Sequence, residues 1–244
     1  MKTAIIETLQ KTINLYKSSF KLFFVFSLSL SILIESLKIY ALKIELYDTL
    51  GKYFEYGNIL DYLESNALLM FLGVFSIFTT IGIYGLLIYL CKMQFENKSP
   101  HLTISQIYKA LYIFKGRFWC FFLVFFINVF LSGLSGFLGI IGVWLINSFS
   151  FIVFPIILLA NIGISQAYYR SFIMMSKNVT YALQIGFIEF FLLGIKHVTY
   201  FTFSNIYCGL EHTIIILTDA LLFPFVTMLM IVVYHHLLTL SEDN

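Results

Sequence analysis

Six stretches of hydrophobic residues alternate with polar segments along the chain. A helix needs about 20 apolar residues to cross the hydrocarbon layer of a membrane, because each residue adds a rise of about 1.5 Å. The uncharged run 118–158 is too long for one crossing and suits two helices that meet at a glycine-containing turn. We therefore expect six transmembrane helices, at residues 22–40, 67–91, 118–137, 141–162, 181–203 and 213–236.

Three polar segments share a second pattern and precede the first, third and fifth expected spans. Each has apolar residues at steps of three and four, which is typical of a helix lying in the membrane interface. We expect these interfacial helices at 1–18, 103–114 and 165–176. The predicted fold class is thus an all-α membrane protein, a single domain 1–244 with six transmembrane helices. They form three hairpins, each preceded by an interfacial amphipathic helix. The alternative is that the segments are alike only because multi-span proteins keep basic linkers on one side.

The positive charges divide unevenly between the two sides that this arrangement defines. Eleven basic residues fall on the side of the N-terminus: Lys2, Lys11, Lys17, Lys21, Lys92, Lys98, Lys109, Lys115, Arg117, Arg170 and Lys177. Three fall on the other side: Lys38, Lys43 and Lys52. Because loops rich in Lys and Arg stay in the cytoplasm, we expect both termini there and the acidic loop 43–66 outside.

The composition favours a membrane protein and argues against other classes. Of the 244 residues, 60% are hydrophobic and 11% are charged, whereas soluble domains average about 25% charged residues. So few polar groups cannot cover an ordinary water-facing surface. The formal net charge of +2 gives no electrostatic reason to expect a nucleic-acid partner. The lipid bilayer is the partner that the composition indicates.

The sequence has no motif for catalysis or metal binding. The cysteines Cys91, Cys120 and Cys208 lack the spacing of a metal or redox site. His235 and His236 are adjacent, so they point to different sides of a helix. HExxH, P-loop and GxSxG patterns do not occur. We therefore expect no cofactor, no metal and no enzymatic activity.

Glu189 and Lys196 are the most unusual residues of the fifth expected span. A charge at the centre of a transmembrane helix costs about 2.5–3.5 kcal/mol on insertion scales, so each needs a compensating role. Seven residues separate the two, which places them on one helix face about 10 Å apart. Such a pair suits a proton relay or a substrate path. The alternative is a structural role, in helix packing or with each charge reaching an interface.

Other polar residues of the spans have simpler expectations. Glu35 and Asp219 lie near the outer ends of the first and sixth spans, where a charge costs little. Asn128, Asn147 and Asn161 are expected to bridge helices through hydrogen bonds.

The stretch from residue 144 to 180 carries a family resemblance. It contains Phe154–Pro155–Ile156–Ile157–Leu158 in the fourth span, then Ala167 and Arg170–Ser171 in the following linker. On these residues the chain resembles the YciC-like family of uncharacterised bacterial inner-membrane proteins. It departs from the family at Val143–Trp144, where a Pro–Gly pair is usual. The resemblance implies a six-span protein of the bacterial inner membrane and supplies no active site.

Two kinds of function follow from these features. The first is a non-enzymatic, envelope-related membrane protein of unknown molecular function. The alternative is a small-molecule transporter or channel that uses Glu189 and Lys196. The basic interfacial segments also make anionic lipid headgroups candidate partners. A polar cavity inside the membrane that reaches Glu189 and Lys196 would favour transport, whereas a dry, close-packed bundle with both residues at interfaces would exclude it.

Overall fold

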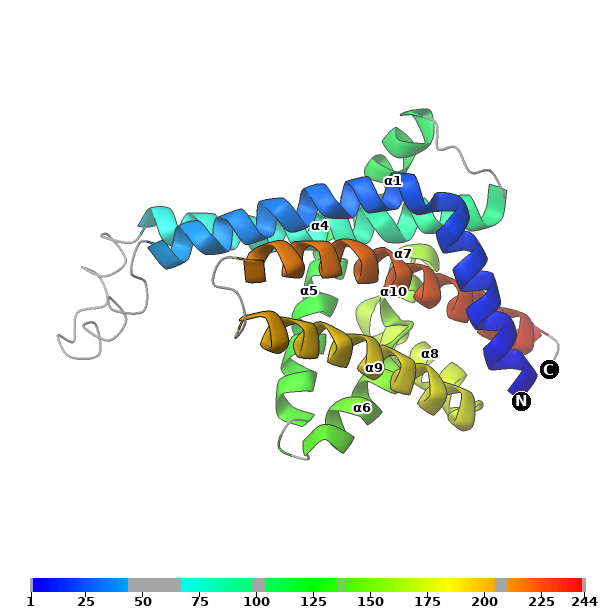
Figure 1. Cartoon of the computed structure of the whole chain (residues 1–244). Coiled ribbons are helices and arrows are strands. Elements are labelled where there is room, and N and C mark those ends of the chain that lie inside the picture. Colours follow the sequence, from blue (N-terminus) through cyan, green and yellow to red (C-terminus); the bar gives the residue numbers. More distant parts are fainter. Residues whose placement is uncertain are drawn as a thin grey trace.

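All of the regular secondary structure that is described is helical (Figure 1). The computed structural model describes residues 2–43, 67–97, 104–135, 137, 139–204 and 210–242. The expected acidic loop 43–66 lies almost wholly outside these residues. The helices are α1 (Lys2–Lys43), α4 (Ala67–Asn97), α5 (Ile104–Ser135), α6 (Gly139–Ser150), α7 (Val153–Leu159), α8 (Ile164–Ser176), α9 (Val179–Ser204) and α10 (Leu210–Glu242).

Several of these helices are long and apolar enough to cross a membrane. Among the described residues, four stretches have this length and composition: Ile77–Glu96, Ser105–Ser135, Gly139–Leu159 and His212–Leu240. The two legs of α1 together add a fifth. The apolar part of α9, Val179–Leu192, is shorter. The chain is therefore a helical protein with the helices of a membrane protein.

The three expected interfacial segments join their spans in three different ways. Ala4–Lys21 and Phe23–Ser36 are two legs of α1 that meet at a bend of 69°, visible in Figure 1. Ser18 and Ser19 both donate to the carbonyl oxygen of Leu15, at 2.9 and 2.7 Å. Such back-bonding loosens a helix and accounts for the bend. The second segment is continuous with its span in α5, whereas the third is a separate helix, α8.

The fourth expected span is divided between α6 and α7. The helix breaks at Phe151–Ile152. Pro155 explains the break, because it has no N–H to donate and its ring would clash with the carbonyl group four residues earlier. In the first turn of α7 the same residue is well tolerated. The backbone N–H of Ile156 resumes the helical pattern by donating to Ile152 at 3.0 Å.

α1 packs mainly against α10, and it buries small hydroxyl side chains as well as the large apolar Phe23. The buried residues of α1 include a run of hydroxyl groups: Thr8, Thr12, Ser19, Ser27 and Ser31. Ile13, on the apolar face expected for residues 1–20, is instead exposed. Small residues let helices approach closely in lipid, where burial of large apolar groups gives no advantage. Tyr16 completes the contact by donating to the Leu221 carbonyl oxygen at 3.0 Å, beside Pro224 of α10.

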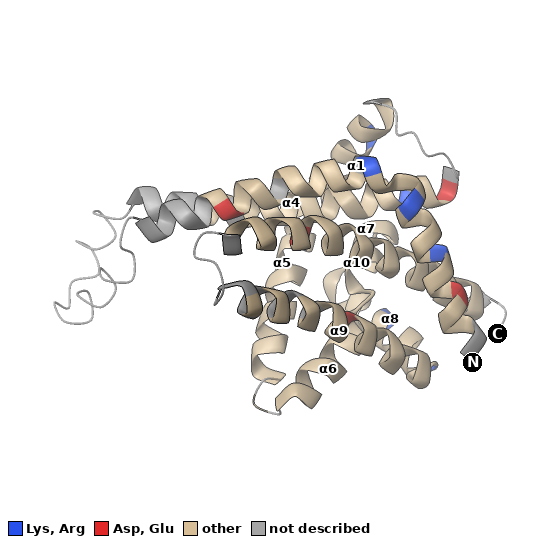
Figure 2. Ribbon diagram, viewed as in Figure 1, with Lys and Arg blue, Asp and Glu red and all other residues tan. Residues whose placement is uncertain are grey.

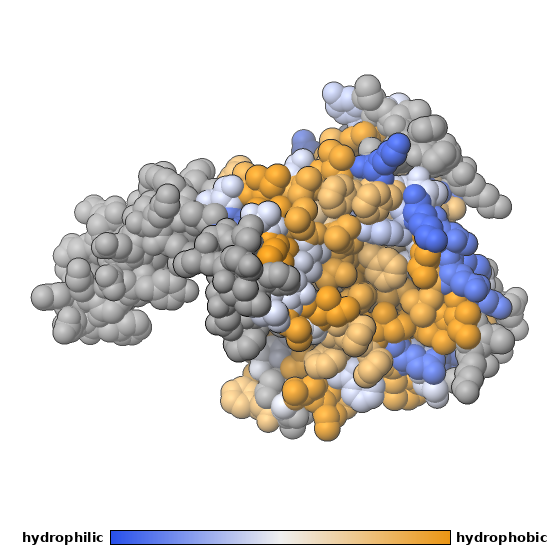
Figure 3. Space-filling model, in the orientation of Figure 1, coloured by the Kyte–Doolittle hydropathy of each residue, from blue (hydrophilic) through white to orange (hydrophobic). Residues whose placement is uncertain are grey.

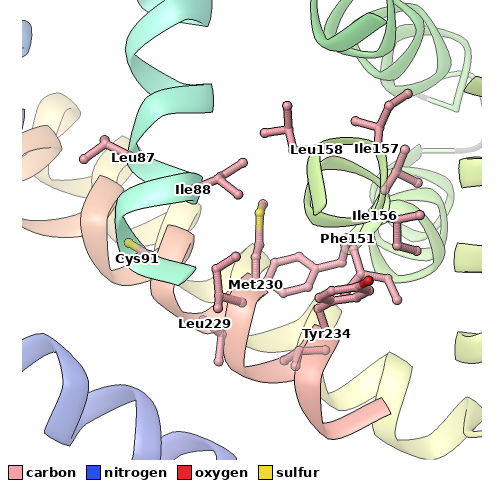
Figure 4. Close-up of a cluster of buried hydrophobic side chains, with 14 of the residues drawn as sticks. Leu87, Ile88, Cys91, Phe151, Ile156, Ile157, Leu158, Leu229, Met230 and Tyr234 are labelled. Carbon is pink, nitrogen blue, oxygen red and sulfur yellow. The ribbon is translucent and has the colours of Figure 1, made fainter. Parts of the chain in front are cut away.

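A cluster of buried apolar side chains lies where α4, α7 and α10 meet (Figure 4). Leu87 and Ile88 of α4, Ile156 and Ile157 of α7 and Leu229 of α10 are fully buried there. α4 is apolar on all sides at this level, which fits a central helix. α8 also contacts the core: the Tyr168 hydroxyl donates a hydrogen bond to the Val124 carbonyl oxygen at 3.3 Å. Burial raises the pKa of Tyr168 to about 12, so the phenol stays neutral.

Charge is concentrated at one end of the bundle. Figure 2 shows the described Lys and Arg residues gathered at the end where both termini lie. On the face seen in Figure 3, that edge is hydrophilic and most of the remaining described surface is hydrophobic. This placement agrees with a basic, terminus-bearing side and an apolar body, which is the pattern the sequence predicts.

Candidate functional site

A mostly apolar cavity with several polar side chains in its lining lies between α4, α5, α6, α7, α9 and α10. Its volume is about 540 Å³, within the range of small-molecule binding sites. We call it the acidic cavity, because two carboxyl groups are among its lining residues. Its polar lining residues are Thr80, Tyr84, Asn128, Ser132, Asn147, Ser150, Glu189 and Asp219. Each of them lies within one of the spans expected from the sequence.

Aromatic rings form much of the remaining wall. The phenylalanines of the lining are Phe125, Phe151, Phe154 and Phe223. Tyr84 stands at the junction with the packed core: its ring centre is 5.3 Å from that of Phe154 and 5.0 Å from that of Phe223. Its hydroxyl group donates to the sulfur of Met230 at 3.1 Å. The packed core thus forms one wall of the acidic cavity, and aromatic rings line the cavity together with the two carboxyl groups.

Glu189 has an unusual environment within the acidic cavity. Its side chain lines the cavity from α9, and its Oε2 atom is buried. None of the described residues offers that oxygen a hydrogen-bond partner. Buried polar groups are almost always hydrogen-bonded, and an unpaired one usually marks a function or a missing ligand. The sequence singled out this residue, and the structure shows that it faces a cavity rather than lipid.

The residue that accompanies Glu189 differs from the one the sequence suggested. Asp219 of α10 lines the same cavity, although its position near a span end predicted residence at an interface. The side chain of Lys196, the expected partner on α9, lies outside the described residues. Two acidic side chains therefore line the cavity, and a carboxylate attracts cations.

The asparagines behave in three different ways. Asn147 accepts a hydrogen bond from the Ser132 hydroxyl at 3.3 Å, which bridges α6 and α5 as expected. Asn128 forms no such bridge, since neither its amide nitrogen nor its amide oxygen has a partner among the described residues. Asn161 lies outside the cavity, in the turn after α7, with a φ of 57°. Asn128 thus adds a second unpaired polar group to the lining.

A close approach of two helices holds Glu189 in place. Gly186, one turn before it in α9, faces Ser148 of α6. A Cβ atom at Gly186 would overlap the Ser148 side chain and come within 3.0 Å of its Cα atom. Only glycine allows this spacing, and small residues serve the same purpose in other membrane helix pairs. The position of the Glu189 carboxyl group therefore depends on Gly186, which has no side chain.

A further buried acid lies away from the cavity. Glu35 of α1 has a side chain that is 5% exposed and lies 2.7 Å from Nδ1 of His212 in α10. The sequence placed Glu35 near the outer end of the first span but gave no sign that it meets His212. This contact joins α1 to the beginning of α10. We assign it a structural role, because both groups have partners.

The described residues contain no cluster suited to a metal ion. No three His, Cys, Asp or Glu side chains in this part of the chain lie close enough to share one. Of the cysteines, Cys91 is buried and Cys120 is partly buried, both as free thiols. The acidic cavity is thus a candidate site for an organic ligand.

Known proteins provide no template for this site. Comparison with protein-family models, curated protein sequences and solved structures gives no match to the chain. The resemblance to the YciC-like family stays a prediction. The function has to be inferred from the geometry itself.

Proposed function

We propose that the protein is a multi-pass membrane protein that binds a small organic cation in the acidic cavity and moves it across the bilayer. The observation behind this proposal is the enclosed, unpartnered oxygen of Glu189 beside a cavity that Asp219 also lines. An ionised carboxyl group without a partner is costly in apolar surroundings. A cation or a proton that enters the cavity removes this cost.

The walls favour an organic cation over a bare metal ion. A metal ion of the hard, oxygen-binding kind needs six or more oxygen ligands close around it. The acidic cavity is much larger than such a cage, and Phe125, Phe151 and Phe223 line it together with the acids. Aromatic faces attract organic cations and exclude water around them. An organic cation with an amine or quaternary ammonium group and an apolar remainder matches both the acidic and the aromatic residues of this lining.

Transport needs a way to release the bound cation. A carboxyl group can hold either a proton or a cation, so the arrival of one can drive the departure of the other. Glu189 has this capacity and lies within a span, where acidic residues commonly mark ion and proton paths. We therefore propose exchange of the cation for a proton at Glu189. Lys196 stays a candidate for the same path on the spacing argument alone.

The membrane arrangement is part of the proposal. We propose six spans in three hairpins, both termini in the cytoplasm, and residence in the bacterial inner membrane, as the YciC-like resemblance implies. The gathering of basic residues at the terminus-bearing end supports the orientation. α9 belongs among the spans on this view, although its apolar part, Val179–Leu192, is short. The protein is proposed to be a binding and transport protein, not an enzyme.

Equilibrium dialysis of ethidium, an aromatic cation, against the full-length protein in detergent tests the proposal. Wild-type protein should bind ethidium and should not bind fluorescein, an aromatic anion. Glu189→Gln should weaken ethidium binding by about 30-fold, because a charged partner contributes about 2 kcal/mol. Glu7→Gln, the same change at an exposed position of α1, is the matched control and should bind normally.

Two results would decide against the proposal. Equal binding of ethidium by the wild type and Glu189→Gln would show that the carboxyl group is not the cation site. No binding by well-folded wild-type protein would leave the non-enzymatic, envelope-related role without a transported cation. Uptake of ethidium into proteoliposomes that contain DNA, driven by a proton gradient, then tests the transport step.

A further inference from the structure

A second hollow lies at the basic end of the bundle, separate from the acidic cavity. It has a volume of about 780 Å³ and lies between α4, the first half of α5 and the turn from α7 to α8. None of its lining residues also lines the acidic cavity. We call it the basic pocket, after Lys92, Lys115 and Arg117, which line it.

The charge balance of the basic pocket is positive. Among the described residues, Glu96 is the acid within ion-pair distance of these three cations, 3.6 Å from Lys92. Lys115 is exposed, and Arg117 is half-buried. Arg117 uses Nη1 to donate to the Ile162 carbonyl oxygen at 3.2 Å. A guanidinium group has five N–H donors, so donors are left for a ligand.

One wall of the basic pocket is fixed by hydrogen bonds. Tyr89 of α4 donates to the Leu158 carbonyl oxygen at 2.6 Å, and Arg117 holds Ile162 four residues later. Between them Asn161 adopts a φ of 57°, a left-handed conformation that Asn tolerates better than most residues. The turn is thereby tied to both α4 and α5. Its Asn161 side chain adds neutral donor and acceptor groups to the pocket.

An apolar stripe leads away from the basic pocket along α5. Tyr112 lines the pocket and is 82% exposed. Steps of three, four and seven residues continue one helix face from there, and the residues on it are exposed: Trp119, Leu123, Phe126 and Phe130. A basic hollow followed by a lipid-facing apolar stripe has the two halves of a phospholipid site, for headgroup and acyl chain.

We propose that the basic pocket binds the phosphate group of an anionic phospholipid. Arg117 offers the planar, forked donors that suit phosphate, and Lys115 and Lys92 add point charges. Basic pockets between membrane helices at the cytoplasmic side are suited to anionic headgroups. The apolar stripe on α5 favours a lipid over a soluble phosphate, because only a lipid has acyl chains that can contact an apolar surface. The inference does not depend on cation binding in the acidic cavity.

Native mass spectrometry of the full-length protein tests this assignment. The protein is released from mixed micelles with equal amounts of phosphatidylglycerol and phosphatidylcholine. Wild-type protein should retain phosphatidylglycerol preferentially. Each basic residue removed should reduce that preference about fivefold, in Lys115→Gln and further in Lys115→Gln combined with Arg117→Gln. Lys109→Gln, at an exposed position of α5 that does not line the pocket, is the matched control.

The variants and a competitor keep the test decisive. Lys115 is exposed and forms no hydrogen bond to the turn within the described part of the chain, so Lys115→Gln should fold even if the double variant does not. Inorganic phosphate at millimolar concentration should leave the retained phosphatidylglycerol unchanged. Displacement by phosphate would show a soluble-anion site and overturn the lipid assignment. Equal loss in Lys115→Gln and Lys109→Gln would show surface attraction without a specific pocket, which also overturns it.

Discussion

The acidic cavity and the basic pocket differ in how deep their charges lie. Glu189, within a predicted span, has a buried oxygen that no described residue partners. Lys115 of the basic pocket is exposed at the end of the bundle. A charge in apolar surroundings interacts strongly with whatever enters, whereas a charge in water is screened over about 10 Å. The cavity is therefore suited to selecting a ligand, and the pocket to holding the molecule at a lipid surface.

One short helix connects the two sites. α7 contributes Phe154 to the acidic cavity and Leu158 to the basic pocket. It exists as a separate helix because Pro155 ends the pattern of α6. If the chain were continuous here, the turn that carries Asn161 would point elsewhere. The same break thus orients a wall of each site.

The largest difference between the sites should come from Gly186→Leu. The added side chain would collide with Ser148 and push α9 away from α6, which displaces Glu189. Overpacking of this kind costs about 3 kcal/mol, so we expect a lower melting temperature in detergent and loss of ethidium binding. Retention of phosphatidylglycerol should survive, because the basic pocket includes no residue of α9.

Gly194→Leu is the matched control for that experiment. Gly194 is in the same helix, and nothing lies within 4 Å of a Cβ atom built there. It should melt and bind like the wild type. If Gly186→Leu retained normal ethidium binding, the close contact of α6 and α9 would not be what positions the site.

Asp219→Asn should have a smaller effect than Glu189→Gln. The substitution removes one of two negative charges from the acidic cavity but leaves the enclosed carboxyl group in place. We expect ethidium affinity to fall about tenfold, since charged hydrogen bonds contribute about 1.5–3 kcal/mol. Dialysis measures the affinity, and phosphatidylglycerol retention serves as the internal control. A loss as large as that of Glu189→Gln would make Asp219 the primary cation ligand instead.

The smallest effect is expected from Tyr89→Phe. The loss of its hydroxyl group frees the Leu158 carbonyl oxygen and loosens the turn behind the basic pocket. The turn keeps its hydrogen bond to Arg117, so we expect a loss of about 0.7 kcal/mol, within the range for a neutral hydrogen bond, and a phosphatidylglycerol preference about threefold lower. Ethidium binding should not change. Tyr112→Phe, at the exposed tyrosine of the same pocket, should change neither; an equal loss there would show that the hydroxyl groups act on the lipid directly.

Glu189 could be found from the sequence because its signal is chemical. A carboxyl group within an apolar span is costly whatever surrounds it, so composition and position are enough. Asp219 was harder, since its place along the chain says nothing about which way it faces. Its role depends on how α10 is rotated against α4 and α9. The same holds for Asn128, because the side chains that neighbouring helices place beside its amide decide whether the amide is hydrogen-bonded.

The fold shows the same division. Hydropathy predicts helices where the structure has them, and the basic residues gather at one end as expected. The connections between helices depend on details that hydropathy does not show. Ser18 and Ser19 bond to one carbonyl oxygen near the bend of α1, whereas α5 is continuous through Gly116. On α1 the expected apolar face is partly exposed and Thr8 and Thr12 are buried. Ile5, Leu9 and Tyr16 of that face still pack against the core, so the buried hydroxyl groups add to the helix contact, as small groups do between membrane helices.

Photolabelling with an azido derivative of ethidium tests the central claim most directly, because it reports where the cation binds. The account predicts cross-linked peptides from the cavity walls, around Tyr84, Phe125 and Phe223. It also predicts that excess unlabelled ethidium protects them and that Glu189→Gln abolishes the labelling. Labelling confined to the exposed stripe of α5, or labelling unchanged in Glu189→Gln, would contradict a cation site in the acidic cavity.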